Sequence, residues 1–154
     1  VLLLQGNLSL DLTERLLRAA RAAGATALFN PAPYWPGAER IARHGSLLIA
    51  NRLEAEALGP ALHEAERAIV TLGAEGCRLV EGTQRRAFPA TAVAAVDTTG
   101  CGDTFCGVLA AALARGKPLA AAIGAAQAAA ALTATRPGAF AALPRRDELR
   151  AILD

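Results

Sequence analysis

Short apolar runs alternate along this chain with segments that have helical periodicity, and this alternation restricts the fold more than any other feature. The spacing is that of parallel βαβ units, with one hairpin inserted near residue 80. We therefore predict an α/β fold with a mostly parallel sheet. The predicted strands are residues 2–5, 25–29, 46–50, 68–72 and 77–80, the last turning back across Gly82-Thr83.

The first predicted helix has clear signals at both ends. Ser9 can cap its start, leucines recur on one face, and Gly24 can end it. A chain of 154 residues has the length of one compact domain, so we expect residues 1–154 to form a single α/β domain. The predicted helices are residues 10–23, 39–43, 52–58, 61–67, 103–115, 119–132 and 147–153.

Composition argues against several classes of function. The net charge is +2 without a basic cluster and aromatic residues make up 4%, so we expect no nucleic-acid surface. Hydrophobic residues make up 53%, yet no uncharged apolar stretch is long enough to span a bilayer. No secretory signal is evident, and the three cysteines lack zinc-site spacing, so we expect reduced thiols and a cytoplasmic location.

Polar residues stand where several predicted strands end. Asn30, Asn51, Gly73 and Asp97 each follow an apolar run. Ligands of parallel α/β sheets bind at the carboxyl ends of the strands, so we expect a binding site along that edge.

The strongest chemical signal is the run Asp97-Thr98-Thr99-Gly100-Cys101-Gly102-Asp103. Its two glycines allow a tight turn directly before a predicted helix, so exposed N–H groups and the helix dipole favour a bound phosphate. Asp103 can accept a proton from an attacking hydroxyl. The same residues fit about equally well a plain strand-to-helix turn in which Asp97 or Asp103 only caps a helix.

Residues 97–103 resemble the Asp-Thr-x-Gly-Ala-Gly-Asp signature of the ribokinase-like (PfkB) carbohydrate kinases. Four further segments resemble motifs of this family in the same order: Asn30-Pro31-Ala32-Pro33, Asn51-Arg52-Leu53-Glu54, the Gly-x-x-Gly nucleotide loop at 70–76, and the adenine- and cation-covering segment at 135–139. The resemblance implies a ribokinase-like three-layer sandwich and an ATP-dependent phosphotransferase acting on a hydroxyl of a small sugar.

The resemblance also implies roles for individual residues. Asp103 corresponds to the general base, and the amides of Gly100, Cys101 and Gly102 form the anion hole. The residues it assigns to the nucleotide are Asn51, Thr71, Gly73, Glu75, Gly76, Gln127 and Gly138.

Two metal sites are implied in the same way. Asn51 and Glu54 correspond to the residues that order Mg²⁺, although a helix cap explains this pair equally well. A potassium site is implied at Asp97 and Thr99 with carbonyls near Thr133, Arg136 and Gly138; Asp97 as a buried cap is the alternative.

Three departures from the family pattern stand out. Cys101 replaces an alanine and introduces a thiol that oxidation can modify. Asn7 stands where ribokinases have a glutamate that contacts ribose, which leaves the identity of the sugar open. The family's amino-terminal half, with its Gly-Gly sugar motif and the lid used in dimerisation, is not in this sequence. Since the chain opens at Val1 inside a strand-like run and has no Met, we expect a longer gene product, with a homodimer as one option.

Three functional classes follow. The first is a kinase of a small sugar or nucleoside-like substrate, favoured because Asp103, Asn51 and Glu54 are all present. The second is an ATP-binding fragment or regulatory relative without turnover. A dinucleotide-dependent oxidoreductase is less well supported, since no Gly-x-Gly-x-x-Gly follows the first strand. We expect the isolated 154-residue piece to bind ATP-magnesium weakly and to phosphorylate no sugar.

Overall fold

The computed structural model describes residues 1–154, and its six strands form one sheet in the order β1-β2-β3-β4-β5-β6. Strands β1 to β4 pair in parallel, and β5 runs antiparallel to β4. The mostly parallel sheet and the hairpin predicted near residue 80 are therefore confirmed. The strands are β1 (Leu2–Gln5), β2 (Ala27–Asn30), β3 (Leu47–Asn51), β4 (Ala68–Thr71), β5 (Cys77–Glu81) and β6 (Gln84–Phe88).

The α-helices are α1 (Leu10–Ala22), α2 (Ala38–Ile41), α3 (Arg52–Leu58), α4 (Cys101–Ala114), α5 (Leu119–Ala134) and α6 (Arg146–Leu153), and the 3₁₀ segments are η1 (Ala42–His44), η2 (Gly59–His63) and η3 (Gly73–Glu75). All six α-helices overlap predicted ones. The helix predicted at 61–67 is wrong, since only a 3₁₀ segment ending at His63 forms there. Arg67 instead pairs with strand β3, because its carbonyl oxygen accepts a hydrogen bond from Leu48 N at 2.9 Å.

The chain separates into two compact units. Unit 1 comprises Val1–Gly73 with Cys77–Ala87, and unit 2 comprises Ala74–Gly76 with Phe88–Asp154. The expectation of one domain over residues 1–154 stays a prediction.

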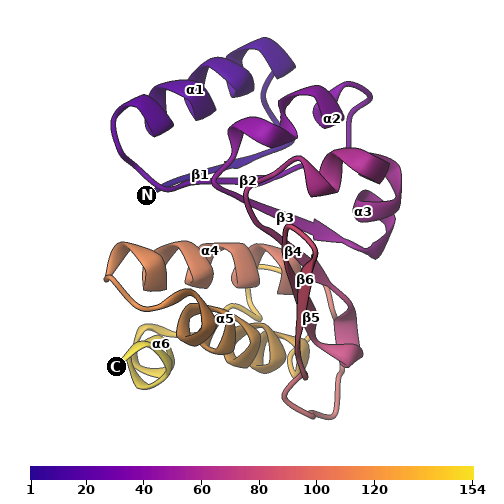
Figure 1. The fold of residues 1–154 in the computed structure, drawn as a ribbon. Coiled ribbons are helices and arrows are strands. Elements are labelled where there is room, and N and C mark those ends of the chain that lie inside the picture. Colours follow the sequence, from indigo (N-terminus) through magenta and orange to yellow (C-terminus); the bar gives the residue numbers. More distant parts are fainter. The chain divides into compact units, whose positions relative to one another are not determined.

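In unit 1, the helices α1, α2 and α3 lie along one face of the parallel strands (Figure 1). Leu17 of α1 belongs to one buried cluster with Phe29 of β2 and Leu48 of β3, each at most 1% exposed. Burial of each such side chain is worth about 1.5–3 kcal/mol. The predicted cap is present, because Ser9 Oγ accepts a hydrogen bond from Leu12 N at 3.3 Å. These contacts hold α1 against the strands and fix the turn between β1 and α1.

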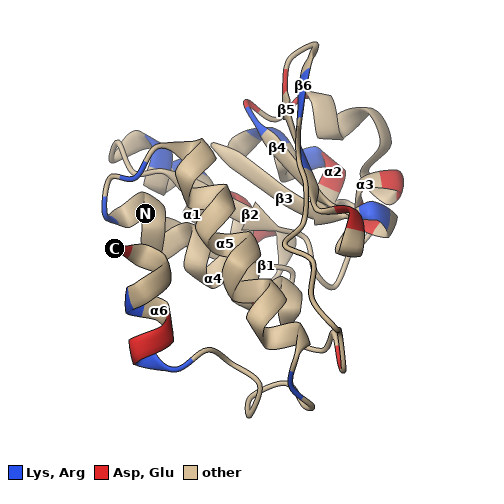
Figure 2. Ribbon diagram, turned by 90° about the horizontal axis from the view of Figure 1, so that it is seen from below, with Lys and Arg blue, Asp and Glu red and all other residues tan.

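Unit 2 is built on α4 and α5, which pack against each other, with α6 beside α5 (Figure 1). Asp103 is the only charged residue in α4 and α5 has none, whereas α6 carries both signs (Figure 2). A buried hydrogen bond of 3.0 Å joins the hydroxyls of Thr104 on α4 and Thr133 on α5. Neither of these apolar helices, nor any other in the structure, combines the length and the hydropathy that crossing a membrane requires.

The backbone of unit 2 passes very close to Gly76. A Cβ on this residue, whose φ is +92°, would lie 2.1 Å from the carbonyl oxygen of Phe88 and 2.6 Å from the nitrogen of Ala90. Both obstacles are main-chain atoms and cannot rotate away. We expect Gly76→Ala to lower the free energy of unfolding by about 2–4 kcal/mol, measured by denaturant titration.

Gly124 in α5 provides the matched control for that substitution. No atom lies within 4 Å of a Cβ built there. Gly124→Ala should therefore raise the free energy of unfolding by about 0.5–1 kcal/mol through helix propensity. Equal unfolding midpoints for the two variants would show that the main chain at Phe88 can move aside.

Candidate active site

A row of polar side chains ends the first three strands of unit 1. Gln5, Asn30 and Asn51 are the last residues of β1, β2 and β3. Gln5 Nε2 donates to Asn30 Oδ1 at 3.5 Å, and Asn30 Nδ2 donates to the carbonyl of Ile49 at 2.8 Å. Because parallel strands present their carboxyl ends at one edge, Asn30 and Asn51 lie at the polar edge that the sequence predicts, together with Gln5. The prediction is wrong for Asp97, because no strand directly precedes it and it belongs to unit 2.

Asn51 and Glu54 are joined by three hydrogen bonds at the start of α3. Asn51 Oδ1 accepts from Glu54 N at 2.9 Å, Glu54 Oε2 accepts from Asn51 N at 2.8 Å, and Asn51 Nδ2 donates to Glu54 Oε1 at 2.8 Å. This is a capping box, so the helix-cap interpretation is confirmed. The metal assignment of the pair stays a prediction, and a cap does not oppose it.

The carboxyl group of Glu54 has a perturbed acidity. Burial raises its pKa above the ordinary value, and hydrogen bonds from Asn51 and Asn30 only partly oppose this shift. A nearby cation would stabilise the charged form and reverse the shift. Thr71, assigned to the nucleotide, lies beside this pair, since it is the partner of Asn51 across β3 and β4.

Asn7, the predicted sugar contact, lies exposed in the turn after β1. Its neighbour Gly6 is fixed on both sides, because Gly6 N donates to Ala32 O at 3.0 Å and its carbonyl accepts from Trp35 Nε1 at 2.6 Å. The indole of Trp35 is 56% exposed. The sequence analysis did not single out Trp35, because nothing in the local pattern indicates that it reaches back to the β1 turn.

The glycine-rich loop of unit 2 turns sharply into α4. Gly100 is the residue before the helix and has a φ of +79°, and Gly102 and Asp103 lie exposed in the first turn. Cys101 N donates to Thr98 O at 3.2 Å, whereas the N–H groups of Gly100 and Gly102 have no acceptor within the chain. Two of the three amides assigned to the anion hole are therefore open at the positive end of α4.

The interpretation of Asp97 or Asp103 as a cap of α4 is wrong, whereas the phosphate-binding role of this loop stays a prediction. No side chain caps α4, and Asp103 is itself the third residue of the helix. Asp97 instead ties two loops together. Its Oδ1 accepts from Thr99 N at 2.9 Å and Thr99 Oγ1 at 2.7 Å, and its Oδ2 accepts from Gly138 N at 2.8 Å.

These three hydrogen bonds lower the pKa of Asp97 below its ordinary value. The carboxylate is therefore charged at neutral pH. The structure thus brings together three residues assigned to the potassium site, namely Asp97, Thr99 and Gly138.

The thiol of Cys101 is half-buried beside the loop. Its Sγ lies 3.5 Å from the carbonyl oxygen of Ala130. Burial, together with the charge of Asp97, raises the pKa of this thiol. The protonated thiol is the less reactive form, so these surroundings work against the oxidation that its position suggested.

The other two residues assigned to potassium are held differently. The side chain of Thr133 is fully buried, with Oγ1 bonded to Thr104 Oγ1 and donating to Ala129 O at 3.1 Å. Its carbonyl accepts Arg136 N at 3.1 Å. The guanidinium of Arg136 forms a bidentate ion pair with Glu148 on α6, which the sequence analysis did not single out.

The remaining nucleotide assignments are divided between the two units. Gly73 and Glu75 are the first and last residues of η3. Gly73 belongs to unit 1 and Glu75 to unit 2. In unit 2, Gln127 Nε2 donates to the carbonyls of Phe88 at 3.0 Å and Pro89 at 3.3 Å, the same segment that Gly76 touches. Gln127 and Gly76 are therefore brought together around residues 88–90, and their contact with adenine stays a prediction.

Comparisons with known proteins agree with this geometry. Residues 2–146 match the family described as pfkB family carbohydrate kinase. Ribokinase of Bacillus subtilis (strain 168) is 36% identical over 133 residues, covering 82% of this chain and 45% of the relative.

Solved structures give the same result. Ribokinase from Thermotoga maritima superposes with a TM-score of 0.85 at 34% identity, covering 98% of this chain and 55% of that one. Aminoimidazole riboside kinase from Salmonella enterica, complexed with aminoimidazole riboside and ATP analog, gives 0.78 at 30% identity, covering 91% and 56%. The chain spans about half the length of the relatives it matches.

Proposed function

This chain belongs to the pfkB family of carbohydrate kinases, and we propose that it supplies the nucleotide-binding and catalytic part of an ATP-dependent kinase of a small sugar or nucleoside-like substrate. One observation carries the proposal. Two open amides at the start of α4, Gly100 and Gly102, stand in the same turn as the carboxylate of Asp103. Anion-binding donors next to a proton acceptor are what phosphoryl transfer to a hydroxyl requires.

The residues fit the groups that such a reaction needs. The open amides and the dipole of α4 suit the phosphates of ATP. Asn51 and Glu54 offer the oxygen atoms that Mg²⁺ prefers, with a single carboxylate between them. This pattern suits Mg²⁺, which usually keeps several waters and substrate phosphates as ligands. When bound, ATP-magnesium supplies the phosphoryl group and offsets its charge.

In the proposed mechanism Asp103 takes the proton of the substrate hydroxyl as the hydroxyl oxygen attacks the γ-phosphorus of ATP, the bond from that phosphorus to the bridging oxygen breaks, and ADP leaves. The amides of Gly100 and Gly102 donate to the oxygens of the transferring group. Asp97 holds this loop in place through Thr99 and Gly138. Asn7 is a hydrogen-bonding contact for a substrate hydroxyl, since a neutral amide can still bond a sugar hydroxyl, and the identity of the sugar stays open.

A second candidate is an ATP-binding relative without turnover. The ATP analog and aminoimidazole riboside in the Salmonella enterica complex favour catalysis on a nucleoside-like or sugar substrate. A cytoplasmic location, a homodimer and a potassium requirement remain predictions.

An assay of the complete gene product decides between the two candidates. We expect ADP release that depends on at least one member of a panel of pentoses, hexoses and nucleosides, measured with ATP and Mg²⁺ in a coupled assay. Calorimetry of ATP binding provides the control. ATP binding without turnover on every compound of the panel would support the second candidate instead.

A further inference from the structure

Arg136 and Glu148 of unit 2 form a bidentate ion pair. Arg136 Nη1 donates to Glu148 Oε2 at 3.1 Å, and Arg136 Nη2 donates to Glu148 Oε1. Both side chains are only about a quarter exposed, at 27% and 25%. Glu148 Oε2 also accepts Arg145 N at 2.7 Å at the start of α6. Bidentate pairs of this kind fix geometry as well as adding attraction.

Arg136 belongs to a segment that lies directly against the glycine-rich loop. The carbonyl of Ala134 accepts Val96 N at 2.7 Å, and Gly138 N donates to Asp97 Oδ2 at 2.8 Å. A Cβ on Gly100 would lie 3.4 Å from the carbonyl oxygen of Ala139. The loop at 96–100 is therefore in contact with the segment at 134–139 at both of its ends.

We propose that Arg136 and Glu148 form a clamp that positions the glycine-rich loop, by tying the segment at 134–139 to α6. The hydrogen bonds of both side chains go to each other and to Arg145 N and not to the loop, so both are positioning residues. We infer the clamp from these contacts alone. The effect that we expect on ATP binding rests, in addition, on the proposed function.

The acidity of Glu148 shows how strongly the contact favours the charged pair. Hydrogen bonds from Arg136 and Arg145 lower the pKa of Glu148 to about 2. Glu148 is therefore charged at neutral pH, and an amide substitution removes that charge.

Arg136→Gln is the informative variant, because it breaks the ion pair and leaves the hydrogen bond from Arg145 N to Glu148 in place. Hydrogen–deuterium exchange with mass spectrometry on the complete gene product measures the result. We expect exchange in peptides covering 96–104 and 134–143 to accelerate by about tenfold, with β2 and β3 unchanged. Glu148→Gln should do the same, and the double variant should add nothing further.

Asp147→Asn is the matched control. It removes an equal charge from the same first turn of α6 without touching the hydrogen bonds to Arg136. We expect its exchange at 96–104 to equal that of the parent. If the exchange rate at 96–104 is unchanged in Arg136→Gln, the clamp hypothesis is wrong. It is also wrong if Glu148→Gln accelerates exchange only in α6.

Kinetics supply the functional readout. If the loop binds phosphate, Arg136→Gln should raise the KM for ATP several-fold and leave the KM for the sugar unchanged. A parent protein without turnover would refute the proposed function, and the exchange measurement would still decide the clamp. An unchanged KM for ATP in an active enzyme would contradict the positioning role.

Discussion

Asp103→Asn in the complete gene product is expected to lower kcat by roughly 10²–10⁴-fold while the KM for ATP changes little. Asparagine keeps the shape of the side chain but cannot take a proton from the attacking hydroxyl. The amides of Gly100 and Gly102 belong to the backbone, so the proposed phosphate contacts survive the substitution. Steady-state kinetics with ATP and the preferred sugar measure both parameters.

Asp11→Asn controls for the loss of one exposed carboxylate near a helix start. Asp11 lies in the first turn of α1 and makes only a long ion pair of 3.9 Å with Arg15. Its kcat should match that of the parent. Equal turnover in Asp103→Asn and the parent would remove Asp103 from the mechanism, and an equal loss in both variants would point to a general charge effect.

The second large effect is expected at Glu54. Glu54→Gln should raise the Mg²⁺ concentration needed for half-maximal turnover by about 10–100-fold, because outer-shell partners of a metal contribute on that scale. Glutamine keeps one oxygen that can accept Asn51 N, and Asn51 Oδ1 can still accept the backbone N–H of residue 54, so two of the three hydrogen bonds of the cap remain while the one from Asn51 Nδ2 is lost. A magnesium titration of kcat at saturating ATP measures the shift.

The acidity of Glu54 adds a pH signature to this experiment. Because burial raises its pKa, the carboxylate loses its charge at a higher pH than an ordinary glutamate does. The parent should therefore need more Mg²⁺ as the pH falls towards that raised value, and Glu54→Gln should lack this dependence. A magnesium requirement with the same pH dependence in both proteins would separate Glu54 from the metal.

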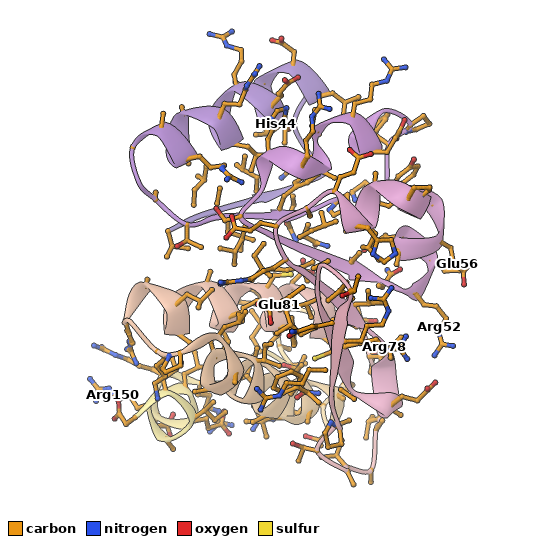
Figure 3. The ribbon with its side chains drawn as sticks, viewed as in Figure 1. His44, Arg52, Glu56, Arg78, Glu81 and Arg150 are labelled. Carbon is orange, nitrogen blue, oxygen red and sulfur yellow. The ribbon has the colours of Figure 1, made fainter.

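Glu56→Gln is the control in the same helix. Figure 3 shows Glu56 on α3 pointing away from the body of unit 1, and its side chain is exposed. Its magnesium requirement should equal that of the parent. A similar shift in both variants would show that the overall charge of α3, and not Glu54, sets the requirement.

Local sequence was sufficient for most of the secondary structure. Ser9 and Gly24 delimit α1 because capping depends on residues next to the helix ends. The helix predicted at 61–67 failed because the pairing of Arg67 with β3 is a contact between residues far apart in sequence. Some helix ends also differ from the prediction, as in α5, which continues to Ala134.

The candidate site divides in the same way. Sequence alone was sufficient to select the candidate site residues, namely the glycine turn, Asp103 and the pair of Asn51 and Glu54, because each belongs to a local pattern. Only the tertiary structure decided that Asp97 joins Gly138 and that Arg136 pairs with Glu148. These partners lie 41 and 12 residues apart, and an isolated Arg or Glu has no local signature that names its partner. Distances between side chains on different elements are set by packing, which no short motif records.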